Sequence, residues 1–162
     1  MKYPKMIRGL HWLMAVIFLT LILAVEIPFR NEGMAIRIHK SLGLLAFALV
    51  VLRLITRALT KAPTPSGSAL NQKLAQAGHA VLYVLMVSVP LTMLVGSLYG
   101  HGLDFFLWHF KAPWHDTAKS KALFEVHKIL ANTFIYVVLG HIAAALWHHF
   151  VKKDGTLSKM AS

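Results

Sequence analysis

Two histidines, His127 and His141, stand fourteen residues apart in the last long apolar run of the chain. At about 100° per residue, fourteen helical steps return to within roughly 40° of the starting direction, so both imidazoles share one face of a helix. A rise of about 1.5 Å per residue separates them by roughly 21 Å along the helix axis. Imidazole is an axial ligand of haem iron, and two haems stacked across one bilayer need ligands at about this separation.

Each haem iron also needs a second axial ligand, which another helix must supply. His11 and His39 open two other apolar runs. If successive runs cross the membrane in alternate directions, His11 lies at the depth of His141, and His39 lies at the depth of His127. An imidazole in hydrocarbon is costly without a partner, which makes these four residues candidate haem ligands. The alternative is that each histidine only hydrogen-bonds a neighbouring helix, which would leave a haem-free membrane protein.

Four apolar runs position these histidines. Hydrophobic residues make up 57% of the chain and charged residues 14%, against about 25% charged residues in average soluble proteins. Each run can reach the roughly 20 residues that span a bilayer. We therefore expect an all-α integral membrane four-helix bundle, with one domain over residues 1–162 and helices at about 7–27, 36–58, 70–98 and 122–151. A cleaved signal peptide is the alternative for the first run, which is long for that role.

The basic residues give the chain a formal net charge of +11. They lie in the short stretches between apolar runs rather than in one stripe, which argues against nucleic-acid binding. Ten of the 17 lysines and arginines fall on the side that holds both termini, which predicts cytoplasmic termini. Residues 62–68 then form a cytoplasmic linker, and the aromatic-rich residues 99–120 form an outer segment that lies on the membrane. The chain has no cysteine, which excludes disulfides and thiolate-ligated metal groups.

Zinc is the other metal that histidines bind, but it prefers three or four ligands at one depth. The histidines of the apolar runs show no such cluster, and those of the outer segment, His101, His109 and His115, are either a loop metal site or merely solvated. Small residues such as Gly43, one turn after His39, suit a flat cofactor between helices as well as ordinary helix packing.

Several short motifs together resemble those of the bacterial cytochrome b561 family. They cover nearly the whole chain and are His11-Trp12-Leu13, Ile38-His39, Gly78-His79, His127 with Ala131-Asn132, Gly140-His141 followed by Ile142 to Leu146, His148-His149-Phe150, and Lys153 to Leu157. The resemblance implies four helices, two b-type haems with bis-histidine ligation, and electron exchange with ubiquinone in the bacterial inner membrane. One branch is similar to superoxide oxidase, which oxidises superoxide outside and reduces ubiquinone within the membrane.

By that resemblance His11, His39, His127 and His141 are the axial ligands, in agreement with the helix geometry. His79 and His148 carry over as residues near the inner haem or the quinone, where imidazole can exchange protons; the alternative is that they bind propionates or lipid. Arg53 and Arg57 suit haem propionates or lipid phosphates. Arg37, Lys40 and Lys128 flank the outer ligands and either attract an anionic donor or anchor helix ends.

These observations predict a di-haem cytochrome that transfers electrons between a periplasmic donor, with superoxide as the candidate small anion, and ubiquinone. The chain departs from the family pattern in its cytoplasmic loop and its outer loop, so the donor stays open, and an unidentified redox protein is the other class of donor. The alternative function is a haem-bearing anchor subunit that serves a partner dehydrogenase or hydrogenase. Co-purification of such a partner would favour that alternative.

Overall fold

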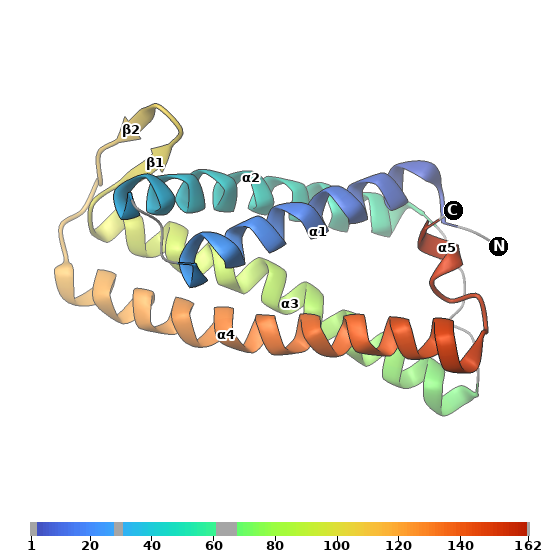
Figure 1. Ribbon diagram of the computed structural model, residues 1–162. Helices are drawn as coiled ribbons and strands as arrows, with labels where there is room; N and C mark the ends of the chain where they lie inside the picture. Colours follow the sequence, from blue (N-terminus) through green and yellow to red (C-terminus); the bar gives the residue numbers. More distant parts are fainter. Residues whose placement is uncertain (1–2, 28–30, 61–67, 162) are drawn as a thin grey trace.

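A computed structural model describes residues 3–27, 31–60 and 68–161 of the chain. Four long helices lie side by side in an elongated bundle (Figure 1). They are α1 (Lys5–Glu26), α2 (Glu32–Leu59), α3 (Ala69–Tyr99) and α4 (Thr117–Trp147). Each is long and apolar enough to cross a membrane. The predicted all-α four-helix membrane bundle is confirmed, whereas the predicted linker at residues 62–68 lies outside the described residues except for Ser68.

Polar caps fix where three of the helices begin. The side chains of Asn31, Ser68 and Asp116 accept hydrogen bonds from backbone N–H groups three residues further on, which satisfies donors that a helix start leaves unpaired. The cap at Asp116 starts α4 five residues before the predicted position, and the cap at Asn31 starts α2 four residues early. Hydropathy could not find these starts because the first turns are partly polar.

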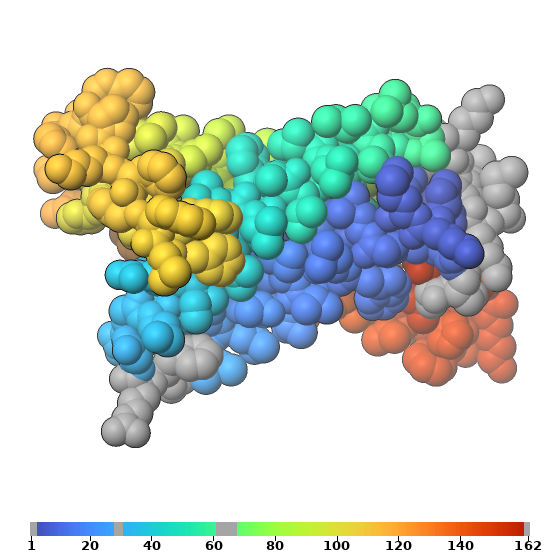
Figure 2. All heavy atoms as spheres, turned by 90° about the horizontal axis from the view of Figure 1, so that it is seen from above, coloured from blue at the N-terminus to red at the C-terminus, as the bar shows by residue number. Residues whose placement is uncertain are grey.

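The chain between α3 and α4, which the sequence predicted only as an aromatic-rich segment on the membrane, forms a small antiparallel hairpin. Its strands are β1 (Leu103–Phe105) and β2 (Trp108–Phe110), with Asp104 opposite His109. Gly102 before β1 has φ of 84°, and a Cβ there would collide with the carbonyl oxygen of Phe110, so only glycine fits this close approach. The hairpin packs on the N-terminal part of α2 (Figure 2). We call this end of the bundle the hairpin end.

The opposite end, which we call the terminal end, holds the start of α1 and the end of the chain (Figure 1). Helix α4 passes into a short π-helix, η1 (His148–Lys152), and the chain then turns back into α5 (Ser158–Ala161). The Trp12 indole N–H donates to the carbonyl oxygen of Met160 at 3.1 Å. Residues 153–161 therefore form a strap across the terminal end of α1. Because η1 continues directly from α4, the histidines of both elements lie on one continuous helical run.

The helices bury little against one another. Of the residues of α4, all of which the structure describes, only Phe134 is buried. It lies seven residues from both His127 and His141, and its ring contacts Phe18 of α1 with centroids 5.1 Å apart. Many large apolar side chains, such as Val16 and Ile129, are exposed instead, as is expected of helix faces that meet lipid. The core is thus concentrated at mid-depth, between the histidine positions at the two ends.

Candidate haem-binding sites

At the hairpin end, the imidazoles of His39 and His127 face each other across the bundle. Their ring centroids are 6.4 Å apart and their planes are perpendicular. An ion held by one nitrogen of each ring at about 2 Å, with each centroid about 1 Å beyond its nitrogen, requires centroids roughly 6 Å apart. The separation is therefore suitable for one iron between the two rings.

Both rings of this pair are oriented by backbone carbonyl groups. The Nδ1 atom of His39 lies 3.0 Å from the oxygen of Leu21, and the Nδ1 atom of His127 lies 2.9 Å from the oxygen of Val89. A carbonyl oxygen can only accept, so each Nδ1 carries the proton and each Nε2 keeps its lone pair. Metal-binding histidines commonly donate their second N–H in this way. The tautomer of both residues suits axial ligation through Nε2.

A cavity of about 60 Å³ lies beside this pair, and its lining includes His39, Gly43 and His127. A Cβ added to Gly43 would meet no heavy atom within 4 Å. Gly43 therefore borders open space next to this histidine pair rather than a tight helix contact. By contrast, a Cβ on Gly96 would lie 3.2 Å from the Cβ of Leu123, which is the usual reason for glycine between packed helices.

At the terminal end, three histidines from three helices meet. The rings of His11 and His141 have centroids 6.4 Å apart, and those of His79 and His141 have centroids 5.7 Å apart. The predicted pair of His11 and His141 is thus brought together with the spacing of the first pair. His79, predicted near the same position, also has its ring against that of His141 and is a second candidate partner for it.

Arg53 closes this cluster from α2. The residue is buried, and its guanidinium donates to the Nδ1 atom of His11 at 3.3 Å and to the oxygen of Ile7 at 3.5 Å. In this arrangement Nδ1 of His11 is an acceptor and Nε2 carries the proton. Ligation by His11 through Nε2 would require Nδ1 to take the proton and the guanidinium to move to another acceptor, such as a propionate. Arg57, the other predicted propionate partner, has an exposed side chain.

His148 lies in η1, seven residues beyond His141. Its Nδ1 atom is 2.5 Å from the Oδ2 atom of Asp154, and both side chains are half-buried. Hydrogen bonds from Thr156 and His148 lower the pKa of Asp154 to about 2, so the carboxylate is ionised at neutral pH. The pair ties the strap to η1.

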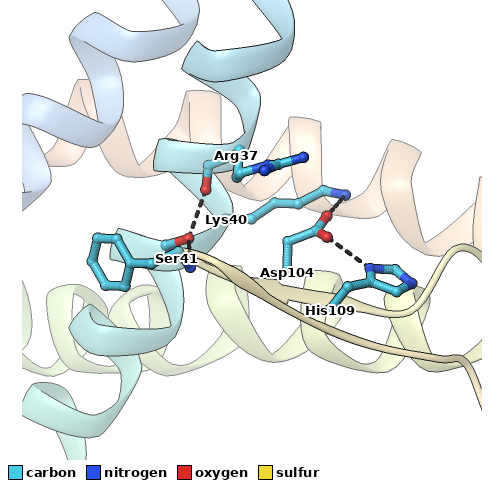
Figure 3. A network of polar contacts seen from close by, with 6 residues as sticks. Arg37, Lys40, Ser41, Asp104 and His109 are labelled. Carbon is cyan, nitrogen blue, oxygen red and sulfur yellow. Dashed lines mark hydrogen bonds and ion pairs between the residues drawn. The ribbon is translucent and has the colours of Figure 1, made fainter.

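The three predicted outer cations differ in their partners. The Nζ atom of Lys40 pairs with Asp104 at 2.8 Å, and that of Lys128 pairs with Glu125 at 2.7 Å. Arg37 is exposed, and only its carbonyl oxygen takes part in the network drawn in Figure 3. The positive charge at the hairpin end is therefore partly cancelled by carboxylates.

The histidines of the outer segment are separated in the structure. His109 pairs with Asp104 at 2.8 Å, whereas His101 and His115 line a different cavity of about 220 Å³ beside Tyr99. Within residues 3–27, 31–60 and 68–161, no group of three or more histidine or carboxylate side chains is placed to hold a metal ion, and the ring contacts among His11, His79 and His141 do not form one. The zinc alternative has no site in this part of the chain.

Sequence reasoning did not single out Asp104, His109 and Asp154 as partners of site residues. Asp154 precedes Gly155, which has φ of 74°, so the Asp-Gly turn was a usable signal for a chain reversal. No signal in the sequence paired Asp104 with Lys40, since 64 residues separate them.

Comparison with known proteins adds independent evidence. A sequence profile described as "Prokaryotic cytochrome b561" matches residues 2–162. The chain is similar to a Yersinia pestis protein named "probable superoxide oxidase CybB", with 29% identity over 98% of this chain and 95% of the relative. It is also similar to Escherichia coli "cytochrome b561 homolog 2", with 29% identity over 98% of this chain and 90% of the relative. "Cytochrome b561 homolog 1" of the same organism is 29% identical over 75% of this chain.

Proposed function

Because the chain belongs to the prokaryotic cytochrome b561 family, a family of haem-binding membrane proteins of electron transport, we propose that it transfers electrons between a periplasmic donor and ubiquinone through two haem b groups. Superoxide is the candidate donor, because one relative is named a probable superoxide oxidase. The proposed location is the bacterial inner membrane, with the hairpin end in the periplasm and both termini in the cytoplasm.

One observation carries the proposal of two haems. Two histidine pairs with equal centroid separations of 6.4 Å bridge different helices, and their α4 members are about 21 Å apart along one helix. We assign His39 and His127 to the outer group and His11 and His141 to the inner group. When bound, haem b supplies reversible one-electron chemistry at iron, with a potential that the ligands and their surroundings tune.

The residues around each pair have distinct proposed tasks. The carbonyl oxygens of Leu21 and Val89 hold the outer imidazoles in the tautomer that presents Nε2. Arg53 offers a buried guanidinium for a propionate, and the exposed Arg57 suits a propionate or a lipid phosphate. His79 and His148 supply protons at the terminal end, since the conversion of ubiquinone to its quinol takes two electrons and two protons.

The haem count and the ligand assignment are tested by substitution. The purified wild-type protein should contain two b haems per chain, both low-spin. His141→Ala should remove the inner haem or make it high-spin while the outer haem stays low-spin, and His39→Ala should do the reverse. His11→Ala and His79→Ala decide between the two partners of His141, because only the ligand variant should lose the inner low-spin spectrum. One haem in the wild-type protein, or two intact spectra in His141→Ala, would contradict the assignment.

The donor is tested by kinetics. Superoxide should reduce the purified protein rapidly, ubiquinone should reoxidise it, and the first step should slow as salt screens the attraction. Replacement of both Lys40 and Lys128 by Gln should slow the reduction and leave reoxidation nearly unchanged, because each substitution leaves a carboxylate without its cation. If superoxide does not reduce the protein, the anchor-subunit function becomes the better proposal.

A further inference from the structure

The hairpin is fastened to α2 directly beside a proposed haem ligand. The backbone N–H of Phe106 donates to the Oγ atom of Ser41 at 2.7 Å, and Lys40 pairs with Asp104 at 2.8 Å (Figure 3). The second oxygen of Asp104 accepts from the Nδ1 atom of His109, which lies opposite it on β2, also at 2.8 Å. Asp104 is therefore held between one cation from α2 and one imidazole from the hairpin.

This ion pair lies in the wall of the cavity beside the outer histidines. Lys40 and Asp104 line the same cavity as His39 and His127, and about a quarter of each of the two side chains is exposed. A small donor that enters this cavity therefore comes close to these two charges as well as to the two histidines. A charged donor therefore responds to the combined charge of Lys40 and Asp104 and not to Lys40 alone.

Asp104 is a full negative charge under physiological conditions. The hydrogen bonds from Lys40 and His109 lower the pKa of its carboxyl to about 2. Without this carboxylate, Lys40 and the exposed Arg37 would form a positive entrance next to His39. With it, the contribution of Lys40 is largely cancelled, which weakens the attraction for anions.

We propose that Asp104 is a specificity-determining residue at the outer site, whose carboxylate offsets the charge of Lys40 and lowers the rate of reduction by anionic donors relative to neutral donors. The inference rests on the proposed entry of electrons at the hairpin end. It adds to that function a residue that selects donors by charge. Asp104 acts through the field it produces and not by contact with the iron.

The test compares an anionic reductant with a neutral one in stopped-flow experiments at low and high salt. The anionic probe is the sulfur dioxide radical anion from dithionite, and the neutral probe is a reduced phenazine. Asp104→Asn should accelerate reduction by the anion about two- to five-fold at low salt and leave the neutral rate unchanged. Lys40→Gln should slow reduction by the anion, and the double variant with Lys40→Gln and Asp104→Asn should be reduced at close to the wild-type rate.

The matched control is Asp116→Asn. Asp116 also pairs with a lysine, Lys119, at 3.2 Å, but it caps α4 outside the cavity lining, and asparagine replaces aspartate well as a helix cap. This variant makes the same change in net charge and should leave both rates unchanged. An equal acceleration in the control would show that overall charge, not Asp104, determines the rate.

The haem content and the absorption spectrum of Asp104→Asn serve to check that this variant folds. If that variant loses haem, His109→Lys decides instead, because it adds a positive charge at an exposed position and keeps the Lys40–Asp104 pair. His109→Lys should accelerate haem reduction by the anionic reductant and leave the rate with the neutral reductant unchanged. Unchanged anion rates in the folded variant, or equal acceleration of both reductants, would overturn the proposal. These reductants report charge selection whether or not superoxide is the physiological donor, so the two proposals can fail separately.

Discussion

Gly43 provides the sharpest test of whether the space beside His39 belongs to a cofactor. It follows His39 by one turn on α2 and lines the cavity beside His39 and His127. A Cβ added there meets no heavy atom within 4 Å, while glycine inside a helix costs about 1 kcal/mol relative to alanine. Gly43→Ala should therefore leave the haem-free protein as stable or stabilise it by up to about 1 kcal/mol.

A larger side chain at this position should act only when haem is bound. Gly43→Leu places four carbon atoms in or beside a cavity of about 60 Å³. Excess volume in a packed site costs about 1–3 kcal/mol, which is roughly a 5- to 150-fold loss of affinity. We expect the haem held by His39 and His127 to bind that much more weakly, while the other haem keeps its affinity and spectrum.

The measurement is haem titration of the haem-free protein, together with the pyridine haemochrome ratio and the thermal melting temperature. Gly96→Ala is the control, because its Cβ would press on Leu123 between α3 and α4 at 3.2 Å. That variant should lower the melting temperature and affect both haems alike. The cavity is not a haem site if Gly43→Leu keeps both haems with unchanged affinity, or if it destabilises the haem-free protein as Gly96→Ala does.

Two further predictions concern the terminal end and the middle of the bundle. Because hydrogen bonds from Thr156 and His148 lower the pKa of Asp154 from 3.8 to about 2 in the folded protein, these contacts stabilise the strap above pH 4 and are lost as the pH falls towards 2; the emission of Trp12 should report the loosening of the strap, and Asp154→Asn should loosen it at all pH values. Phe134→Ala should cost about 3–5 kcal/mol in detergent melting experiments, because it opens a cavity beside Phe18, whereas Phe134→Leu should cost much less.

The sequence predicted the helices because the bilayer requires long apolar runs, and α1 and α3 begin and end within two residues of their predicted limits. It predicted the approach of His39 to His127 and of His11 to His141, because depth in a bundle follows from position along each helix. Ligation by these residues remains a prediction. The hairpin was not predicted, because strands of three residues are too short to show a hydrophobic period. The aromatic residues of this segment suit an interfacial loop equally well.

Side-chain partners were beyond sequence reasoning where they depend on how helices rotate about their axes. Lys40 could point to solvent or to the hairpin, and only the packing of β1 on α2 brings Asp104 to it. Likewise, hydropathy places His79 at the correct depth, but the rotation of α3 decides whether its ring faces His141 or lipid. Electrostatic detail around a membrane site is therefore less predictable than the depth of its ligands.

The two histidine pairs have the same centroid separation, but they differ in whether the ring tautomers leave Nε2 free to bind a metal. At the hairpin end, carbonyl oxygens hold both rings in the tautomer that frees Nε2. At the terminal end, Arg53 donates to the Nδ1 atom of His11, which leaves the ring proton on Nε2. A metal that binds Nε2 needs this proton on Nδ1 instead, so metal binding and the hydrogen bond from Arg53 oppose each other. A buried guanidinium is strongly attracted to a carboxylate, and a propionate that binds Arg53 would release Nδ1 to carry the proton. Binding of the inner group would then depend on its propionates as well as its iron, whereas the outer pair is ready for the iron before either carboxylate arrives.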